Sequence, residues 1–124
     1  MKRITIEQVI EMHSALIAET GGLDGVRDMN LLDGSVNSPY QTFGAQNLYP
    51  TIQAMAAHLA FSLVKNHPFL DGNKRIGVLA MLVFIDVNGI PVHCSNEELI
   101  NLGLGLAEGS IDEAAVIDWI VERS

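Results

Sequence analysis

The segment that most constrains the fold is the run from Ile76 to Ile85, in which apolar side chains face every direction of a helix. A helix that is apolar all round has to be covered by other elements. The run is too short to cross a bilayer, which takes roughly 20 apolar residues. It therefore predicts a central core helix from about Asn73 to Asn88, stopped by Gly89.

The flanking sequence predicts further helices that could cover this one. Pro68 disfavours the helical conformation at His67, so the strongly apolar helix before the central one should end near Asn66. A shorter helix is expected over 30–36. The expected N-terminal caps are Thr5 in a capping box with Gln8, Asp28, Thr51, Ser95 with Glu98, and Ser110 with Glu113.

The chain has 124 residues, of which 48% are apolar, which is typical of one domain with its own core. We therefore expect a single all-α domain over 1–124. The exception to the helical pattern is Ser38–Pro50, with two prolines, a glycine and three aromatic residues. This segment predicts a loop or small hairpin, with strand character at Thr42 and Phe43.

The net charge is −8, and a surface of that sign repels nucleic-acid phosphates and anionic lipid. We therefore expect neither direct nucleic-acid binding nor a membrane partner. Between Asp33 and Asp86, however, Asp71 is the only carboxylate, beside Lys65, Lys74 and Arg75. A small positive island in an acidic protein indicates a specific anion site.

The lone Cys94 cannot form an internal disulfide, which favours a reducing compartment. Lys2 and Arg3 imitate the charged start of a signal peptide, but Glu7 and Glu11 interrupt the apolar stretch that should follow. The expected location is therefore cytoplasmic.

The chemistry should lie between the two most apolar helices, in the segment Asn66–Arg75. Free backbone amides at a helix N-terminus bind anions, and Gly72 allows close approach of a ligand. Lys74 and Arg75 occupy the first turn, where cations are disfavoured by about 0.3–1 kcal/mol each. A bound phosphate chain would explain them, and the alternative is a surface lysine and arginine.

Asp71 and His67 suggest roles beside such phosphates. Asp71 could hold Mg²⁺ against them, or could simply be a turn or cap residue. His67, restrained by Pro68, is a candidate general base, although a lone histidine is more often structural. The other histidines, His13, His58 and His93, have no such context, and no pair has zinc-ligand spacing with Cys94. The Walker pattern of P-loop NTPases is absent.

Residues 67–75 read HPFLDGNKR, which resembles the Fic/Doc motif H-P-F-x-[DE]-[GA]-N-[GK]-R in the variant of the death-on-curing (Doc) branch. The resemblance extends over most of the chain. It includes Gly21-Gly22 with Gly25, Arg27-Asp28, Leu31-Leu32, Thr42-Phe43-Gly44 and Leu48-Tyr49-Pro50-Thr51.

The resemblance implies a compact helical domain that transfers part of ATP to a protein hydroxyl. His67 would deprotonate the hydroxyl and Asp71 would hold Mg²⁺. Pro68 and Phe69 would pack the motif. A flap over Ser38–Tyr49, including Thr42, Phe43 and Gly44, would cover the site and align the target as an added strand. Phosphates would be bound by Gly72, Asn73, Lys74 and Arg75.

The transferred group depends on position 74. Fic enzymes that transfer AMP have glycine there, whereas Doc-type toxins have lysine, transfer the terminal phosphate and act on translation elongation factor Tu. Pro68 and Gly72 are the Fic-like forms of the motif. Phosphate transfer is therefore the first hypothesis and AMP transfer the second.

The inhibitory pattern [ST]-x-x-x-E-[GN] of self-inhibited Fic proteins is absent, because Leu104 stands where serine or threonine is needed before Glu108. The resemblance therefore implies a toxin silenced in trans by an antitoxin protein. A third hypothesis is a catalytically inactive helical module that only binds a partner, but the motif residues argue against it.

Overall fold

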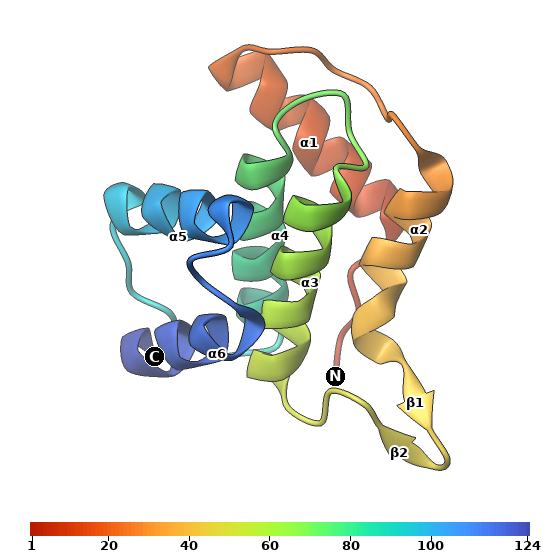
Figure 1. Cartoon of the computed structure of the whole chain (residues 1–124), viewed down its shortest axis with the longest axis vertical. Coiled ribbons are helices and arrows are strands. Elements are labelled where there is room, and N and C mark those ends of the chain that lie inside the picture. The colour runs from red at the N-terminus through yellow and green to blue at the C-terminus, as the bar shows by residue number, and fades with distance from the viewer.

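The computed structural model describes all 124 residues as a helical domain with one small hairpin (Figure 1). The all-α prediction is confirmed. The elements are α1 (Ile6–Thr20), α2 (Met29–Asn37), a 3₁₀ turn (Ser38–Tyr40), β1 (Thr42–Phe43), β2 (Gln46–Asn47), α3 (Ile52–Asn66), α4 (Asn73–Val87), α5 (Asn96–Glu108) and α6 (Glu113–Arg123).

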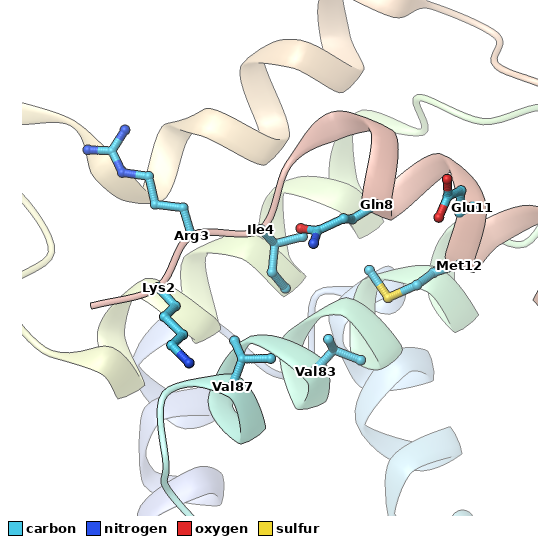
Figure 2. Close-up of a pocket in the computed structure, with 8 residues that line it drawn as sticks. All are labelled: Lys2, Arg3, Ile4, Gln8, Glu11, Met12, Val83 and Val87. Atoms are coloured by element: carbon cyan, nitrogen blue, oxygen red, sulfur yellow. The ribbon is translucent and has the colours of Figure 1, made fainter.

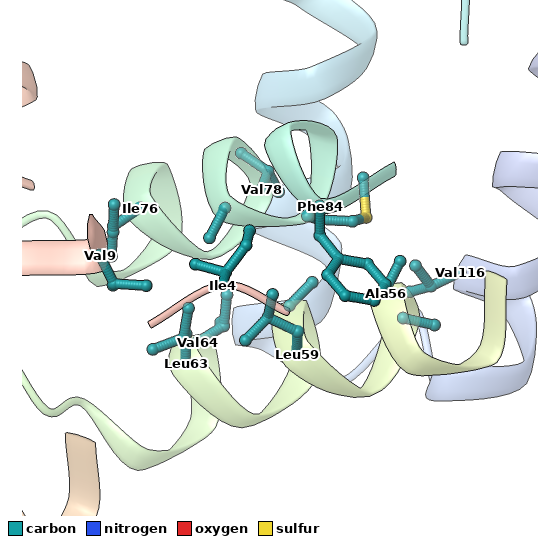
Figure 3. Packing of buried hydrophobic residues seen from close by; sticks show 14 of the residues in the cluster. Ile4, Val9, Ala56, Leu59, Leu63, Val64, Ile76, Val78, Phe84 and Val116 are labelled. Carbon is teal, nitrogen blue, oxygen red and sulfur yellow. The ribbon is translucent and has the colours of Figure 1, made fainter. Parts of the chain in front are cut away.

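Helices α3 and α4 lie antiparallel at the centre, with α1 and α2 on one side and α5 and α6 on the other (Figure 1). The core is formed where their apolar faces meet, and Leu59, Leu63 and Val64 of α3 lie near Ile76 and Phe84 of α4 (Figure 3). The predicted central position of the helix beginning at Asn73 is confirmed. No helix is both long and apolar enough to cross a membrane.

Most predicted helix starts are confirmed, including the two capping boxes at Thr5 and Ser95. The third predicted box is wrong. Asp112, not Ser110, caps α6, and its carboxylate accepts the Ala115 N–H at 2.8 Å. The Ser110 hydroxyl donates instead to the Gly105 carbonyl, and the Glu113 side chain bonds to His58. Glu113 is therefore not available to complete a box.

The predicted hairpin forms, with Thr42 opposite Asn47 and Phe43 opposite Gln46. Gly44 turns the chain in a left-handed conformation at φ 62°. The two ends of the segment are anchored by aromatic side chains. Tyr40 accepts a hydrogen bond from the Ile4 N–H and packs on Phe84, and Tyr49 stacks on His58.

Candidate active site

The motif loop, residues 67–72, joins the C-terminal end of α3 to the N-terminal end of α4. Helix α3 ends at Asn66 as predicted, and His67 takes the left-handed conformation, with φ 48° and ψ 56°. No other non-glycine residue of the chain has a positive φ. Strained backbone of this kind clusters at functional sites. The His67 side chain is exposed and has no hydrogen-bond partner in the chain, so its imidazole is free to meet a substrate.

The connection between α1 and α2 supports the loop from one side. The Pro68 carbonyl accepts the Arg27 N–H at 2.8 Å, and the Leu70 N–H donates to the Gly25 carbonyl at 3.0 Å. These bonds satisfy backbone groups that a short loop would otherwise leave open. The loop is therefore fixed on both sides of Phe69.

Phe69 is the packing anchor that the motif predicts, because its side chain is 1% exposed. Pro68 is buried beside it. Asn73 takes a more internal role than predicted. Its amide accepts the Phe69 N–H at 3.0 Å and donates to the Phe69 carbonyl at 3.1 Å. The Asn73 side chain thus closes the loop on itself, and only its backbone N–H is left for a phosphate.

Asp71 lies where its carboxylate meets two backbone amides. One oxygen accepts the Gly72 N–H at 2.8 Å and the other accepts the Leu23 N–H at 3.3 Å. The bond from Gly72, followed by that from Leu23 and the nearby charge of Arg75, lowers the pKa of Asp71 below its usual value. The carboxylate is therefore ionised at neutral pH, and each oxygen keeps a free lone pair.

The N-terminus of α4 differs from that of every other α-helix in the chain. The other five each have a side chain that accepts a hydrogen bond from the first turn. Helix α4 begins at Asn73 after Gly72, which takes the left-handed conformation at the N-cap, and it has no side-chain cap and no acidic residue in its first turn. The backbone N–H groups of residues 73–75 have no acceptor in the chain. This end of α4 is therefore open to an anion.

The two cations of this turn have different surroundings. Arg75 donates to the Thr20 hydroxyl and, at 3.3 Å, to the Gly21 carbonyl, so it ties α4 to the end of α1. Lys74 is exposed and has no salt-bridge partner. The ammonium group of Lys74 is thus the free positive charge beside the open amides.

His13 is a residue of the site that sequence reasoning missed. It is 1% exposed, its ring stacks on Phe69 at 3.8 Å, and its Nε2 lies 2.7 Å from the Asp71 carbonyl oxygen. A carbonyl oxygen only accepts, so Nε2 donates. Nδ1 is buried without a hydrogen-bond partner. The available signal was the spacing of Val9, His13 and Ile17, which puts His13 on the buried face of α1.

A groove of about 470 Å³ adjoins the open end of α4. Lys74 and Arg75 form part of its wall, and most of the remaining lining is apolar. Ile100 and Leu104 of α5 are exposed along it, at 61% and 41%. The apolar lining residues are Leu16 of α1, Val78 and Leu79 of α4, and Leu99, Ile100 and Leu104 of α5.

A second hollow, of about 340 Å³, lies between the N-terminal segment, α1 and the C-terminal half of α4 (Figure 2). Met12, Val83 and Val87 line it. Arg3 points away from it and lies over the Tyr40 ring at 4.5 Å. None of the predicted site residues lines this hollow.

The hairpin residues Thr42, Phe43 and Gly44 are not brought to the motif loop. They lie beyond the N-terminal end of α3, whereas the loop follows its C-terminal end (Figure 1). A helix of 15 residues is about 22 Å long. The placement differs from the predicted cover over the site, because Tyr40 packs on Phe84 near the C-terminal end of α4 and Tyr49 stacks on His58 of α3.

No group of three histidine, cysteine, aspartate or glutamate side chains could hold a metal ion. A magnesium ion at Asp71 would therefore take its other ligands from substrate and water, which is common for this ion.

Residues 3–85, about two thirds of the chain and all of the motif, match the Fic/DOC family. The chain is 30% identical to a protein named Protein kinase doc from Escherichia phage P1, over 97% of this chain and 94% of that protein. It is 41% identical to Toxin Doc of Mycolicibacterium smegmatis over 70 residues, which are 56% of this chain and 54% of that protein.

Proposed function

Because the chain belongs to the Fic/Doc family, we propose that it is a toxin of the Doc type, which transfers the terminal phosphate of ATP to a serine or threonine hydroxyl of a protein. The relatives named Protein kinase doc and Toxin Doc support this reading. We further propose that it acts in the cytoplasm and is silenced there by an antitoxin.

The observation that carries the proposal is the open end of α4. Three backbone amides without acceptors and the unpaired Lys74 ammonium form a site for a polyphosphate. The exposed His67 imidazole follows the last turn of α3, six residues before Asn73, whose side chain closes the same loop. Phosphate binding and proton transfer would therefore be served by one rigid segment.

In the proposed step, the neutral His67 imidazole accepts the proton of the target hydroxyl. The hydroxyl oxygen forms a bond to the terminal phosphorus while the bond from that phosphorus to the bridging oxygen breaks. The leaving nucleoside diphosphate keeps the electron pair of the broken bond. His67 then returns its proton to solvent. The amides of residues 73–75 and the Lys74 side chain hold the phosphate oxygens during this exchange.

The carboxylate of Asp71 suits a magnesium ligand. Its carboxylate is ionised, and both oxygens keep a lone pair directed away from the amides of Gly72 and Leu23. Bound Mg²⁺ would neutralise phosphate charge and orient the oxygens it contacts. Leu23 and Gly72 would hold the carboxylate ready for this.

The test is parallel labelling with ATP carrying the label at the γ- or the α-phosphate. Translation elongation factor Tu is the first target protein to try. The expected result is transfer of the γ-label only, onto serine or threonine. Transfer of the α-label by the native chain would refute the kinase assignment and establish AMP transfer instead.

Lys74→Gly is the informative variant, because a long cation in the first turn should determine which phosphorus faces the hydroxyl. We expect weaker γ-transfer and some AMP transfer from this variant. Lys65→Gly, which also removes an exposed cation at a helix end, is the control and should keep the native product. An unchanged product in Lys74→Gly would contradict the proposed role of Lys74.

A target protein would have to reach both His67 and the hairpin if the hairpin aligns it. Phe43 is 84% exposed, and both strands have a free edge that could take an extended segment. An interface of standard size covers about 800 Å² per partner and is wide enough to span α3. Phe43→Ser should then raise KM for the target protein without changing KM for ATP. If Phe43→Ser and the native chain have the same KM for the target protein, the hairpin takes no part in target binding.

We propose that the antitoxin inhibits by covering the groove beside Lys74 and Arg75. The groove joins exposed apolar side chains of α5 to the phosphate site, so one occupant could fill both. Ile100→Arg should weaken co-purification with the antitoxin. Cells that express this variant should then stop growing even when the antitoxin is present. The control is Val121→Arg, which introduces the same charge at an exposed apolar position of α6 outside the groove. Equal capture of both variants would move the antitoxin site elsewhere.

A further inference from the structure

The left-handed conformation of His67 needs an external support. Residues with a Cβ atom disfavour this conformation, and the following Pro68 restricts His67 toward extended backbone. Glycine is the residue that usually occupies such a position after a helix. The backbone of His67 is therefore held by its surroundings rather than by its own preference.

The Arg27 side chain supplies two contacts at this point. Its Nε donates to the His67 carbonyl at 2.6 Å, and its Nη2 donates to the Asn66 carbonyl at 2.9 Å. These carbonyls end α3, where the last carbonyl groups have no partner within the helix and the helix dipole is negative. A planar guanidinium group matches two neighbouring acceptors better than an ammonium group does.

Three further observations bear on the role of Arg27. No carboxylate lies within salt-bridge distance of it, so its charge is directed at the two peptide carbonyls alone. Its side chain is also exposed, so packing in the core does not explain it. The backbone N–H of Arg27 bonds to the Pro68 carbonyl, which places three hydrogen bonds from one residue on three successive peptides.

We infer that Arg27 is a positioning residue for His67. It fixes the peptide groups on both sides of the His67 Cα atom, and thereby the direction in which the imidazole leaves the backbone. This inference rests on the proposed function, because the direction of the imidazole matters only if His67 takes a proton. Arg27 itself contacts neither substrate nor the reacting atoms in this proposal.

The alternative is that Arg27 is only a cap for α3. A cap would contribute to stability, whereas a positioning residue would also affect the rate of the chemical step. The variants Arg27→Met and Arg27→Lys separate these roles. Methionine keeps the length of the side chain without its donors, and lysine keeps the charge without the fork. Arg3→Met is the matched control, because Arg3 is an exposed arginine that lies on Tyr40, away from the motif loop.

The first measurement does not depend on activity. The coupling between the amide and Cα protons of His67, together with its carbon chemical shifts, reports the φ angle of this residue. We expect the native and Arg3→Met proteins to give left-handed values. Arg27→Met should give values averaged toward extended backbone, and Arg27→Lys should lie between them. Left-handed values in a folded Arg27→Met would overturn the inference.

The second measurement is the kinetics of phosphate transfer to elongation factor Tu. Misplacement of the base should lower kcat of Arg27→Met by a factor on the order of 10², with KM for ATP unchanged. Free guanidinium at low concentration should restore part of this loss in Arg27→Met and none in His67→Ala. If kcat of Arg27→Met falls no further than kcat of Arg3→Met, and free guanidinium restores no activity, Arg27 is only a cap for α3. If the native chain transfers no phosphate, the proposed function fails, and the φ angle of His67 alone decides whether Arg27 holds it.

Discussion

Substitution of Gly77 by alanine should destabilise the protein, although alanine favours a helix. Gly77 lies on the face of α4 that packs against α3. A Cβ atom there would lie 2.7 Å from the Val64 Cγ2 atom and 3.2 Å from the Ala60 carbonyl oxygen. Distances below 3.0 Å cannot persist, so one of the two helices has to shift.

The expected magnitude follows from two opposing terms. Replacing glycine by alanine inside a helix contributes about 1 kcal/mol to stability. Overpacking a dense core costs about 1–3 kcal/mol. Val64 is buried and has a β-branched side chain with restricted rotation, and the Ala60 oxygen belongs to the backbone, so neither group can move aside. The upper part of that range applies, and the net loss should be about 1–2 kcal/mol.

The assay is equilibrium unfolding in urea, with Gly34→Ala as the control. Gly34 lies in α2, and a Cβ atom there would meet nothing within 4 Å. The control should therefore gain about 0.5–1 kcal/mol from helix propensity alone. If Gly77→Ala proves as stable as Gly34→Ala, the close packing of α3 on α4 described here is refuted.

Three further outcomes are expected. His67→Ala should abolish growth inhibition and lower phosphate transfer by about 10² to 10⁴ while the thermal unfolding curve stays unchanged, and retained toxicity in the folded variant would exclude a catalytic role. Asp71→Asn should raise the Mg²⁺ concentration needed for half-maximal transfer, and an unchanged requirement would leave Asp71 as a turn residue only. The bond from the Ser95 N–H, and then that from Arg123, lower the pKa of Glu98. Glu98 thus stabilises the fold above its unfolded pKa of about 4.3, and this contribution is lost as the pH falls through the lower folded value. Glu98→Gln should therefore show a flatter acid-unfolding profile than the native chain, and equal profiles would contradict the assigned shift.

The sequence predicted the helices because the signals that begin and end them are local. Thr51 caps α3, and the apolar face that follows determines its length. The incorrect prediction of the cap of α6 shows that local signals do not decide every helix start. Ser110 and Asp112 both suit the cap, and the choice depends on Glu113, which bonds to His58 of a helix far away in the sequence. The position of the hairpin is likewise decided by the distant partner of Tyr40, Phe84.

The motif indicated the segment in which the site lies, but it predicted neither the presence of His13 nor the contacts that each side chain makes. Asn73 and His13 are used internally, because their side chains bond to the backbone of the loop. This division has a physical reason. A helix that begins without a side-chain cap and with two cations in its first turn is locally unfavourable. The loop offsets that cost with bonds that satisfy its own backbone groups. The amides that it leaves open, with Lys74 and His67, are then free for a ligand, and a bound phosphate should stabilise the fold by an amount that grows with the logarithm of its concentration relative to Kd.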